Sequence, residues 1–155
     1  MPNENPGYEL PLLLFGGFRT LIDELHAELR DRGHPDVRPA HGFAMQAIGL
    51  DGATASEVGR RLGVSKQAAG KTIDRLEHLG YVRRSADAHD ARRKVVVLTD
   101  DGIDVLRRSA EIFETLRLRW ARTIGAERLR ALESDLGKVV GAHAYRLDAQ
   151  AWFGA

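Results

Sequence analysis

Residues 65–75 carry hydrogen-bond donors and small side chains at the spacing of one helix face. Gln67, Lys71 and Arg75 recur every fourth residue, so on a helix they lie one above the other. A glutamine amide can pair with adenine in a bidentate manner, and a lysine can reach guanine or a phosphate. Ala68, beside Gln67, can meet a thymine methyl group. The row predicts contacts with base edges and phosphates rather than catalysis.

A second polar cluster lies in DAHDARRKVVVLTD, residues 87–100, where acids and bases precede an unbroken apolar run. The apolar run predicts a β-strand, and the segment YVRRS before it predicts another, so the two form a hairpin with a charged tip from Asp87 to Arg92. An arginine at such a tip suits the negative potential of a DNA minor groove. Val95, Val97 and Leu98 are expected to anchor the hairpin to the core.

The charges of the chain are unevenly distributed. Residues 58–94 hold ten Lys/Arg and four acidic residues, although the whole chain of 155 residues carries a net charge of only +1. The remainder is therefore net negative. A basic segment within an acidic frame is typical of a nucleic-acid contact surface, and a solvated charged surface is the plainer alternative.

Patterns typical of enzymes and metal sites are missing from the sequence. There is no cysteine, which excludes disulfides, thiolate metal sites and thiol redox sensing. Gly16-Gly17 lies in an apolar stretch without the Lys-Ser/Thr of a phosphate loop, and no serine has the flanking glycines of a nucleophile elbow. Four histidines are dispersed without ligand spacing: His26, His34, His41 and His143. We therefore expect no enzyme activity, no cofactor and no metal.

Two short helices joined by a turn must position the basic row. Thr54 and Glu57 have the spacing of a capping box, and Gly63 ends a helix of barely two turns whose apolar face is Val58 and Leu62. Ser65 then caps a second helix, which ends before a glycine and a strand. Its buried stripe and terminating glycine are Ala69, Ile73, Leu76, Leu79 and Gly80. The arrangement predicts a helix-turn-helix.

Gly70 stands inside the second of these helices. A glycine there costs about 1 kcal/mol of helix stability relative to alanine. Its presence indicates a close approach, either to DNA or to the preceding helix.

Amphipathic helices flank this unit. We expect one over residues 9–31, stopped by Gly33, and a short one carrying Phe43, Ala44, Ala47, Ile48 and Leu50. Thr99 caps a helix to about residue 122, and a last helix runs to about 149. The stripe expected for the helix after Thr99 is Ile103, Leu106, Ala110, Phe113 and Trp120.

With these residues in view, the chain resembles the MarR family of winged helix-turn-helix regulators over most of its length. SEVGRRLGVSKQAAGKTIDRLEHLGYVRR resembles the family's helix-turn-helix, including the tetrad from Asp74 to Glu77. DAHDARRKVVVLTDDG resembles its wing signature, through Asp90, Arg92, Leu98 and Thr99. Ala88 departs from the pattern, because the family commonly has proline there.

The resemblance implies a mainly α fold with a small β-hairpin wing, in which a winged helix-turn-helix is flanked by N- and C-terminal dimerisation helices. One domain would span residues 1–155, with the DNA-binding lobe at about 40–99 and dimerisation helices at about 9–35 and 100–150. It also implies a homodimer on a pseudo-palindromic operator of double-stranded DNA. The apolar terminal segments agree, and the interface candidates are Leu12 to Phe18, Leu136 to Val140 and Trp152-Phe153.

By the same resemblance, Arg92 would enter the minor groove and Asp90 would orient it or a neighbouring basic side chain. The full set of expected DNA contacts is Ser65, Lys66, Gln67, Ala68, Lys71, Thr72, Arg75, Asp90, Arg92 and Arg93. Relief of repression by a small aromatic or anionic effector is implied as well, with a pocket drawn from Arg19, His41, Phe43 and Trp120.

Two alternatives stay open at this point. The winged helix could be a protein-interaction module without DNA binding, which salt-dependent DNA affinity would distinguish. A metal-sensing variant would need clustered ligands. The N-terminus is acidic and polar, and its longest apolar run is far too short to cross a bilayer. We therefore expect a cytoplasmic protein without a membrane partner.

Overall fold

A computed structural model describes residues 5–141 of the chain. Its elements are α1 (Glu9–Asp31), α2 (Pro39–Ile48), α3 (Ala55–Leu62), α4 (Lys66–His78), β1 (Val82–Ala86), β2 (Lys94–Leu98), α5 (Asp100–Ile124) and α6 (Ala126–Val140). The predicted fold class, mainly α with a β-hairpin wing, is confirmed. The continuation of the last helix to about 149, His143 and Trp152-Phe153 lie outside the described residues.

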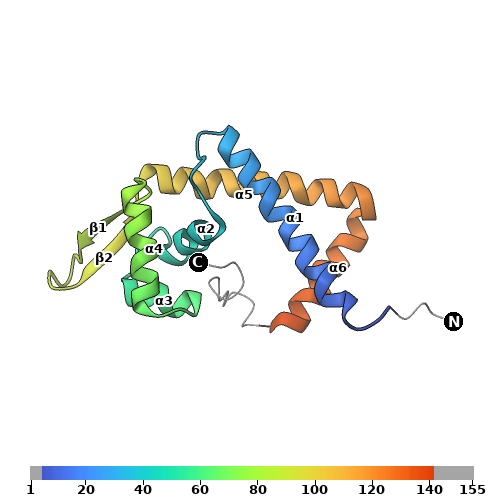
Figure 1. Ribbon diagram of the computed structural model, residues 1–155, viewed down its shortest axis with the longest axis horizontal. Helices are drawn as coiled ribbons and strands as arrows, with labels where there is room; N and C mark the ends of the chain where they lie inside the picture. The colour runs from blue at the N-terminus through green and yellow to red at the C-terminus, as the bar shows by residue number, and fades with distance from the viewer. Residues whose placement is uncertain (1–4, 142–155) are drawn as a thin grey trace.

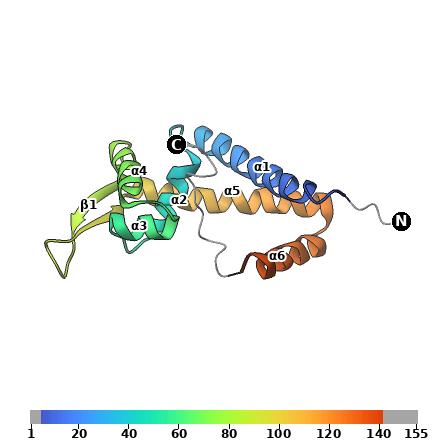
Figure 2. The ribbon, with the colours of Figure 1, turned by 60° about the horizontal axis from the view of Figure 1, so that its bottom comes forward.

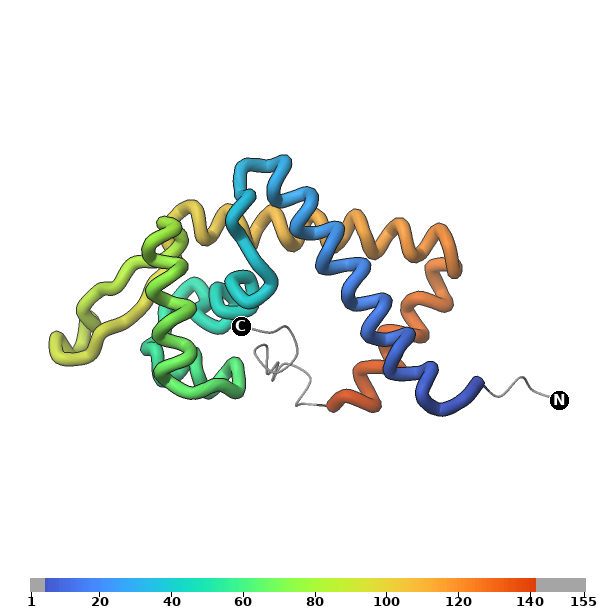
Figure 3. Tube along the Cα trace, viewed as in Figure 1, coloured from blue at the N-terminus to red at the C-terminus, as the bar shows by residue number. Residues whose placement is uncertain are grey.

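The long helix α5 runs the length of the molecule (Figure 1). The hairpin and helices α2, α3 and α4 gather around its first turns, whereas α1 crosses it and α6 folds back from its far end. The tube in Figure 3 shows the hairpin projecting away from the helices. The expected order, with long helices on both sides of a compact winged lobe, is what the structure contains.

One continuous core joins the lobe to the long helices. Met45, Val58 and Ile73 are each fully buried where α2, α3 and α4 meet. The same cluster includes Leu29 of α1 and Ile112 of α5. The lobe and the long helices therefore share one close-packed core, so a displacement of one also displaces the other.

Two residues that were expected on buried apolar faces, Leu50 and Ile103, are exposed. Leu50 lies beyond the end of α2 and is 79% exposed, because Gly49 with φ +68° ends the helix before it. On α5, Ile103 is exposed at 41%. The buried residues of α5 are Gly102, Val105, Ser109, Ile112 and Leu116. Of the predicted stripe, Leu106 and Phe113 are half-buried against the core, whereas Ala110 is exposed. The most buried positions lie one residue earlier, on the side where Gly102 packs against the backbone of Tyr81.

The hairpin is paired antiparallel, from Val82 opposite Leu98 to Ala86 opposite Lys94. Ala53, before α3, adds a bridge on the other side of β2 through two backbone hydrogen bonds with Val96, of 3.0 and 2.8 Å. Val96 is 2% exposed and is the main anchor of the wing. Of the predicted anchors, Leu98 packs against the core, whereas Val95 and Val97 point to the opposite face of the strand and are half-buried.

At the end of the molecule away from the wing, α1 and α6 both pack against α5. Trp120 lies against Gly17 of α1, where a side chain would come within 3.0 Å of the indole ring. Arg117 of α5 binds Glu133 of α6 through two hydrogen bonds of 2.6 and 2.9 Å. Figure 2 shows α6 standing away from α1 on the other side of α5. Within residues 5–141 we find no helix with the length and apolarity that crossing a membrane requires.

Candidate nucleic-acid interface

The turn between α3 and α4 is fixed by local contacts. Thr54 and Glu57 form the predicted capping box, with the Thr54 hydroxyl accepting the Glu57 N–H at 3.2 Å and the Glu57 carboxylate accepting the Thr54 N–H at 3.3 Å. Gly63 ends α3 in the left-handed region at φ +72°. A Cβ at Gly59 would lie 2.9 Å from the carbonyl oxygen of Val64. The close turn therefore depends on glycine at two positions.

Helix α4 presents the predicted row to solvent. Ser65 begins the helix as its N-cap, because its hydroxyl accepts the Ala68 N–H at 3.1 Å. Ala69, Ile73 and Leu76 face inward. The predicted contact residues lie outside this stripe: Lys66, Gln67, Lys71 and Arg75 are exposed, and Ala68 and Thr72 are half-buried. The structure thus brings these six side chains together on one helix.

Gly70 has no atom of the described residues within 4 Å of the position where a Cβ would stand. The structure therefore does not show the close approach to the preceding helix that was one explanation of this glycine. The other explanation, a close approach to DNA, remains a prediction.

We predict that Gly70→Ala raises the free energy of unfolding by up to about 1 kcal/mol, because alanine is the better helix former. The same variant should lower affinity for specific DNA, since the methyl group occupies the approach. Urea unfolding and DNA titration of the same preparation check both effects. Unchanged DNA affinity in a stabilised variant would remove the argument that this position approaches DNA closely.

The acidic residues of α4 are bound to the wing. The Arg84 guanidinium of β1 donates to Asp74 Oδ1 at 2.6 Å and to Glu77 Oε1 at 2.8 Å. The Arg84 backbone N–H also donates to Glu77 Oε2 at 3.3 Å. The hydrogen bond with Asp74 raises the pKa of Arg84 above its ordinary value. One guanidinium thereby offsets half of the negative charge of two carboxylates that would repel phosphates, and β1 is fixed to α4.

The wing tip is shaped by two aspartates. The Asp87 carboxylate accepts the His89 N–H at 2.9 Å, and the Asp90 carboxylate accepts the Arg92 N–H at 3.0 Å. Asp90 was expected to orient the Arg92 guanidinium or a neighbouring basic side chain. It binds the Arg92 backbone instead, as aspartate does in a tight turn. Arg92 itself is exposed.

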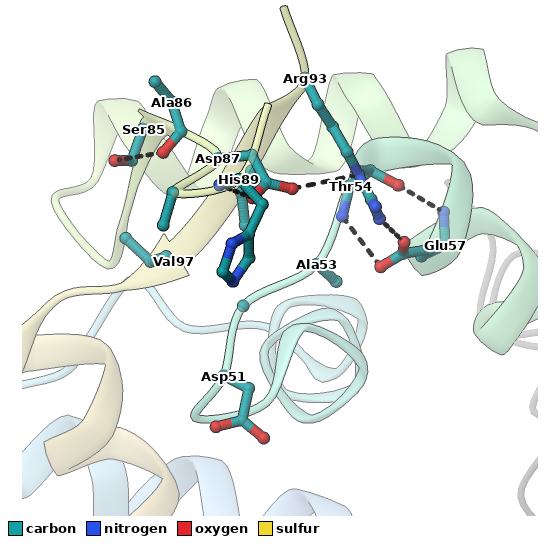
Figure 4. A pocket seen from close by; sticks show the side chains of 13 residues that line it. Asp51, Ala53, Thr54, Glu57, Ser85, Ala86, Asp87, His89, Arg93 and Val97 are labelled. Carbon is teal, nitrogen blue, oxygen red and sulfur yellow. Dashed lines mark hydrogen bonds and ion pairs between the residues drawn. The ribbon is translucent and has the colours of Figure 1, made fainter. Parts of the chain in front are cut away.

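Arg93 points back toward the lobe rather than outward (Figure 4). Its guanidinium binds the Glu57 carboxylate that also caps α3, and its Nε lies 3.7 Å from Asp87 Oδ2. The three residues help to line a cavity of about 360 Å³ between the wing and the segment that leads into α3. In the absence of DNA, Arg93 holds the wing to the lobe, and its contact with DNA stays a prediction.

The ten cations of residues 58–94 fall into two groups. Arg84 and Arg93 have carboxylate partners, and Arg61 donates to the Ala47 carbonyl at 2.6 Å. The other seven are exposed, and their side chains make no hydrogen bond or ion pair to the described part of the chain: Arg60, Lys66, Lys71, Arg75, Arg83, Arg92 and Lys94. Successive side chains of a strand point to opposite faces, and this alternation along β1 predicts that Arg83 faces outward. The sequence therefore contained a signal for Arg83 as a further DNA contact, which was not used.

The four residues expected to line an effector pocket are dispersed. Arg19 lies 3.7 Å from Asp23, and Trp120 covers Gly17. His41 is buried, its Nδ1 accepts the Arg38 N–H at 3.1 Å, and burial lowers its pKa. Phe43 alone lines the small cavity between α1, α2 and α5. With a volume of about 40 Å³, this cavity has room for little more than a water molecule.

Comparison with known proteins gives the context for this geometry. A family model described as "MarR family" matches residues 36–93, which include both helices of the helix-turn-helix and the first strand and tip of the wing. The uncharacterized HTH-type transcriptional regulator YcgE of Bacillus subtilis is 46% identical over 44 residues, which are 28% of this chain and 29% of YcgE. The match therefore spans less than two thirds of that relative.

Solved structures share the fold over nearly the whole chain. Streptococcus pneumoniae FabT, crystallised in complex with DNA, has a TM-score of 0.74 at 18% identity, covering 86% of this chain and 94% of that one. The transcriptional regulator Tm0710 from Thermotoga maritima has a TM-score of 0.60 at 25% identity, covering 88% and 95%. YcgE and Tm0710 both carry the name of a transcriptional regulator rather than of an enzyme. The chain is therefore similar to the MarR family over residues 36–93, and it shares the fold of these solved structures over most of its length.

Proposed function

We propose that the chain is a sequence-specific DNA-binding transcriptional regulator that acts as a homodimer on a pseudo-palindromic operator. The observation that supports this proposal most directly is that the acidic and basic side chains of the lobe differ in whether they have partners within the protein. Acids of the recognition helix α4 and of the wing are bound within the protein, while seven basic side chains of the lobe have no partner among residues 5–141. FabT, which shares the fold, was crystallised with DNA.

In this function, α4 enters the major groove and the wing lies against the neighbouring minor groove. Lys66, Gln67 and Arg75 would contact phosphates and base edges from α4, and Arg92 would reach the minor groove from the tip. Phosphate contacts supply most of the affinity, whereas the contacts with bases set the sequence preference.

The homodimer is supported by apolar side chains of α1 and α6 that the single protomer leaves in water, which together we call the apolar face. Leu10, Leu13 and Phe15 of α1 are 63%, 66% and 44% exposed, and Val139 of α6 is 85% exposed. Apolar side chains exposed on two helices at the same end of the molecule (Figure 1 and Figure 2) favour association there. Two protomers joined there would place two copies of α4 on one face of DNA, about one helical turn apart.

Repression and its relief by a small aromatic or anionic effector complete the proposal, with action in the cytoplasm, where the operator would be. Binding at an operator would exclude the transcription machinery. Since the cavity beside Phe43 is only about 40 Å³, an effector there would have to open it. Opening that cavity would move α2 relative to α1 and α5, and the two-state logic requires that the effector bind the opened form more tightly.

The experiment is a fluorescence-anisotropy titration with DNA from upstream of the protein's own gene and with a scrambled sequence, each at two salt concentrations. Tight, salt-sensitive binding that prefers the upstream DNA supports the proposal. Equal weak binding to both would place the operator elsewhere or require an effector. Absence of binding at low salt would favour the protein-interaction module instead.

Arg92→Ala should weaken binding to the preferred DNA by about 1–3 kcal/mol, because one cation leaves the minor groove. The mass of the assembly should stay unchanged, since the tip makes no contact with the apolar face. Arg122→Ala, an exposed arginine at the far end of α5, serves as the matched control and should bind as the parent does. Loss of assembly in Arg92→Ala would contradict the assignment of the wing.

A further inference from the structure

Helices α1 and α4 end in the same way. In α1, Gly33 at φ +94° lets the His34 N–H bond the Leu29 carbonyl at 2.8 Å and the Gly33 N–H bond the Arg30 carbonyl at 3.4 Å. In α4, Gly80 at φ +85° lets Tyr81 bond Leu76 at 2.9 Å while Gly80 bonds Glu77 at 3.0 Å. Both are Schellman motifs. Each motif fixes the residue that follows its glycine, so His34 and Tyr81 are placed by the ends of the two helices.

The side chains of these two residues meet. His34 Nδ1 lies 2.9 Å from the Tyr81 hydroxyl, the ring centroids are 5.6 Å apart, and each residue is 7% exposed. The Tyr81 carbonyl accepts the Thr99 N–H at 3.0 Å and packs against Gly102. Tyr81 is therefore held at its backbone by the start of α5 and at its hydroxyl by the end of α1.

The third member is Asp104 of α5. Its Oδ2 accepts from His34 Nε2 at 2.8 Å and from Arg108 Nε at 2.7 Å, and its Oδ1 accepts from Arg107 at 2.7 Å. The hydrogen bonds from His34 and then Arg108 hold the pKa of Asp104 far below its usual range, so the carboxylate is charged.

A charged Asp104 assigns the direction of its hydrogen bond with His34, because Nε2 must carry a proton to donate to the carboxylate. Nδ1 and the Tyr81 hydroxyl share the second hydrogen bond, in which the hydroxyl is the donor when Nδ1 carries no proton. Burial, followed by the charges of Asp101, Asp36 and Asp104, raises the pKa of Tyr81 and keeps this hydroxyl protonated.

We propose that His34, Tyr81 and Asp104 form a positioning triad that fixes the recognition helix α4 relative to α1 and α5 and thereby sets the affinity of the dimer for its operator. The proposal rests on the DNA-binding function proposed above. Tyr81 follows the glycine that ends α4, His34 follows the glycine that ends α1, and Asp104 belongs to α5. A change at the triad therefore changes the angle of α4 without touching any group that contacts DNA.

This role predicts a split between two kinds of DNA affinity. Specific binding requires both copies of α4 in register with two half-sites, whereas nonspecific binding depends mainly on the number of cations near phosphates. Loosening the triad should weaken the first and spare the second. A residue that only stabilised the fold would change both affinities in proportion to the folded fraction.

The test uses the full chain with Tyr81→Phe, which removes one oxygen and keeps the ring. Tyr8→Phe is the matched control, because Tyr8 is 67% exposed at the start of α1. His34→Ala removes both hydrogen bonds. His34→Gln is the rescue variant, since its amide can donate to Asp104 and accept from Tyr81. Because the chain has no cysteine, His78→Cys gives one spin label on each α4.

Distances between the two labels in the dimer are measured by pulsed electron paramagnetic resonance without DNA, and affinities by anisotropy. Tyr81→Phe and His34→Ala should broaden the distance distribution and weaken specific binding about tenfold, since each protomer loses at least one hydrogen bond. Nonspecific affinity should stay within about twofold. His34→Gln should restore both readouts, and Tyr8→Phe should change neither.

An unchanged distance distribution and unchanged specific affinity in Tyr81→Phe would overturn the triad, even if the parent protein bound its operator well. A parent protein with no DNA preference would overturn the proposed function instead, and with it the link to operator affinity. The label distances, which need no DNA, would then still decide whether the triad orients α4.

Discussion

Replacing Gly102 with alanine is expected to lower the free energy of unfolding by about 3 kcal/mol, at the upper end of the usual cost of overpacking. A Cβ at this position would collide with the carbonyl oxygen of Tyr81 and lie 3.4 Å from Leu98 Cδ2. The carbonyl cannot swing away, because it accepts the Thr99 N–H at the start of α5 and belongs to the backbone that follows α4. Relief would require α5 to move from the lobe.

The measurement is urea unfolding at equal protomer concentration, since association adds to apparent stability. Gly42→Ala in α2 is the matched control, because nothing described lies within 4 Å of its Cβ position. That variant should gain up to about 1 kcal/mol from helix propensity. If both variants changed stability alike, the close contact between Tyr81 and Gly102 would be refuted.

Leu13→Glu should separate the dimer and reduce affinity for the operator by about two orders of magnitude, because a single lobe loses the advantage of binding two half-sites together. Leu13 is 66% exposed in the protomer, so the charge is expected to leave the fold of each subunit intact. In the dimer the carboxylate would be buried against an apolar partner face, at a high cost in free energy.

Sedimentation analysis gives the mass, and anisotropy gives the affinity for the same sample. Leu50→Glu makes the identical change at a leucine that is 79% exposed beyond α2, away from the apolar face, and should keep the dimer mass. A dimeric Leu13→Glu protein would show that the subunits join through another surface.

The features predictable from the sequence were those set within a few residues. Thr54 with Glu57, Ser65 with Ala68, and the glycine that ends α4 act over one helical turn, so their spacing is enough to identify them. The placing of the helix-turn-helix and of the exposed row on α4 followed from these local contacts and from the apolar stripe.

Features that depend on partners far along the chain were missed. Val96, rather than Val95 or Val97, anchors the wing, because Ala53 fixes which face of the strand turns inward. The pairing of Arg93 with Glu57 joins residues 36 positions apart, and His34 lies 47 and 70 positions from its two partners. An unbroken valine run or a dispersed histidine carries no local signal of such contacts.

The pairing of the hairpin also bears on how the protein avoids aggregation. β2 is bordered by β1 on one side and bridged by Ala53 on the other, so within residues 5–141 the outer edge of β1 has no strand beside it. An open edge can recruit a strand from another molecule, and positive charges discourage this. β1 carries Arg83 and Arg84 in the middle of its five residues. Arg83 and Arg84 therefore also disfavour pairing of this edge with a strand of another molecule. Self-association through the apolar helices is favoured instead.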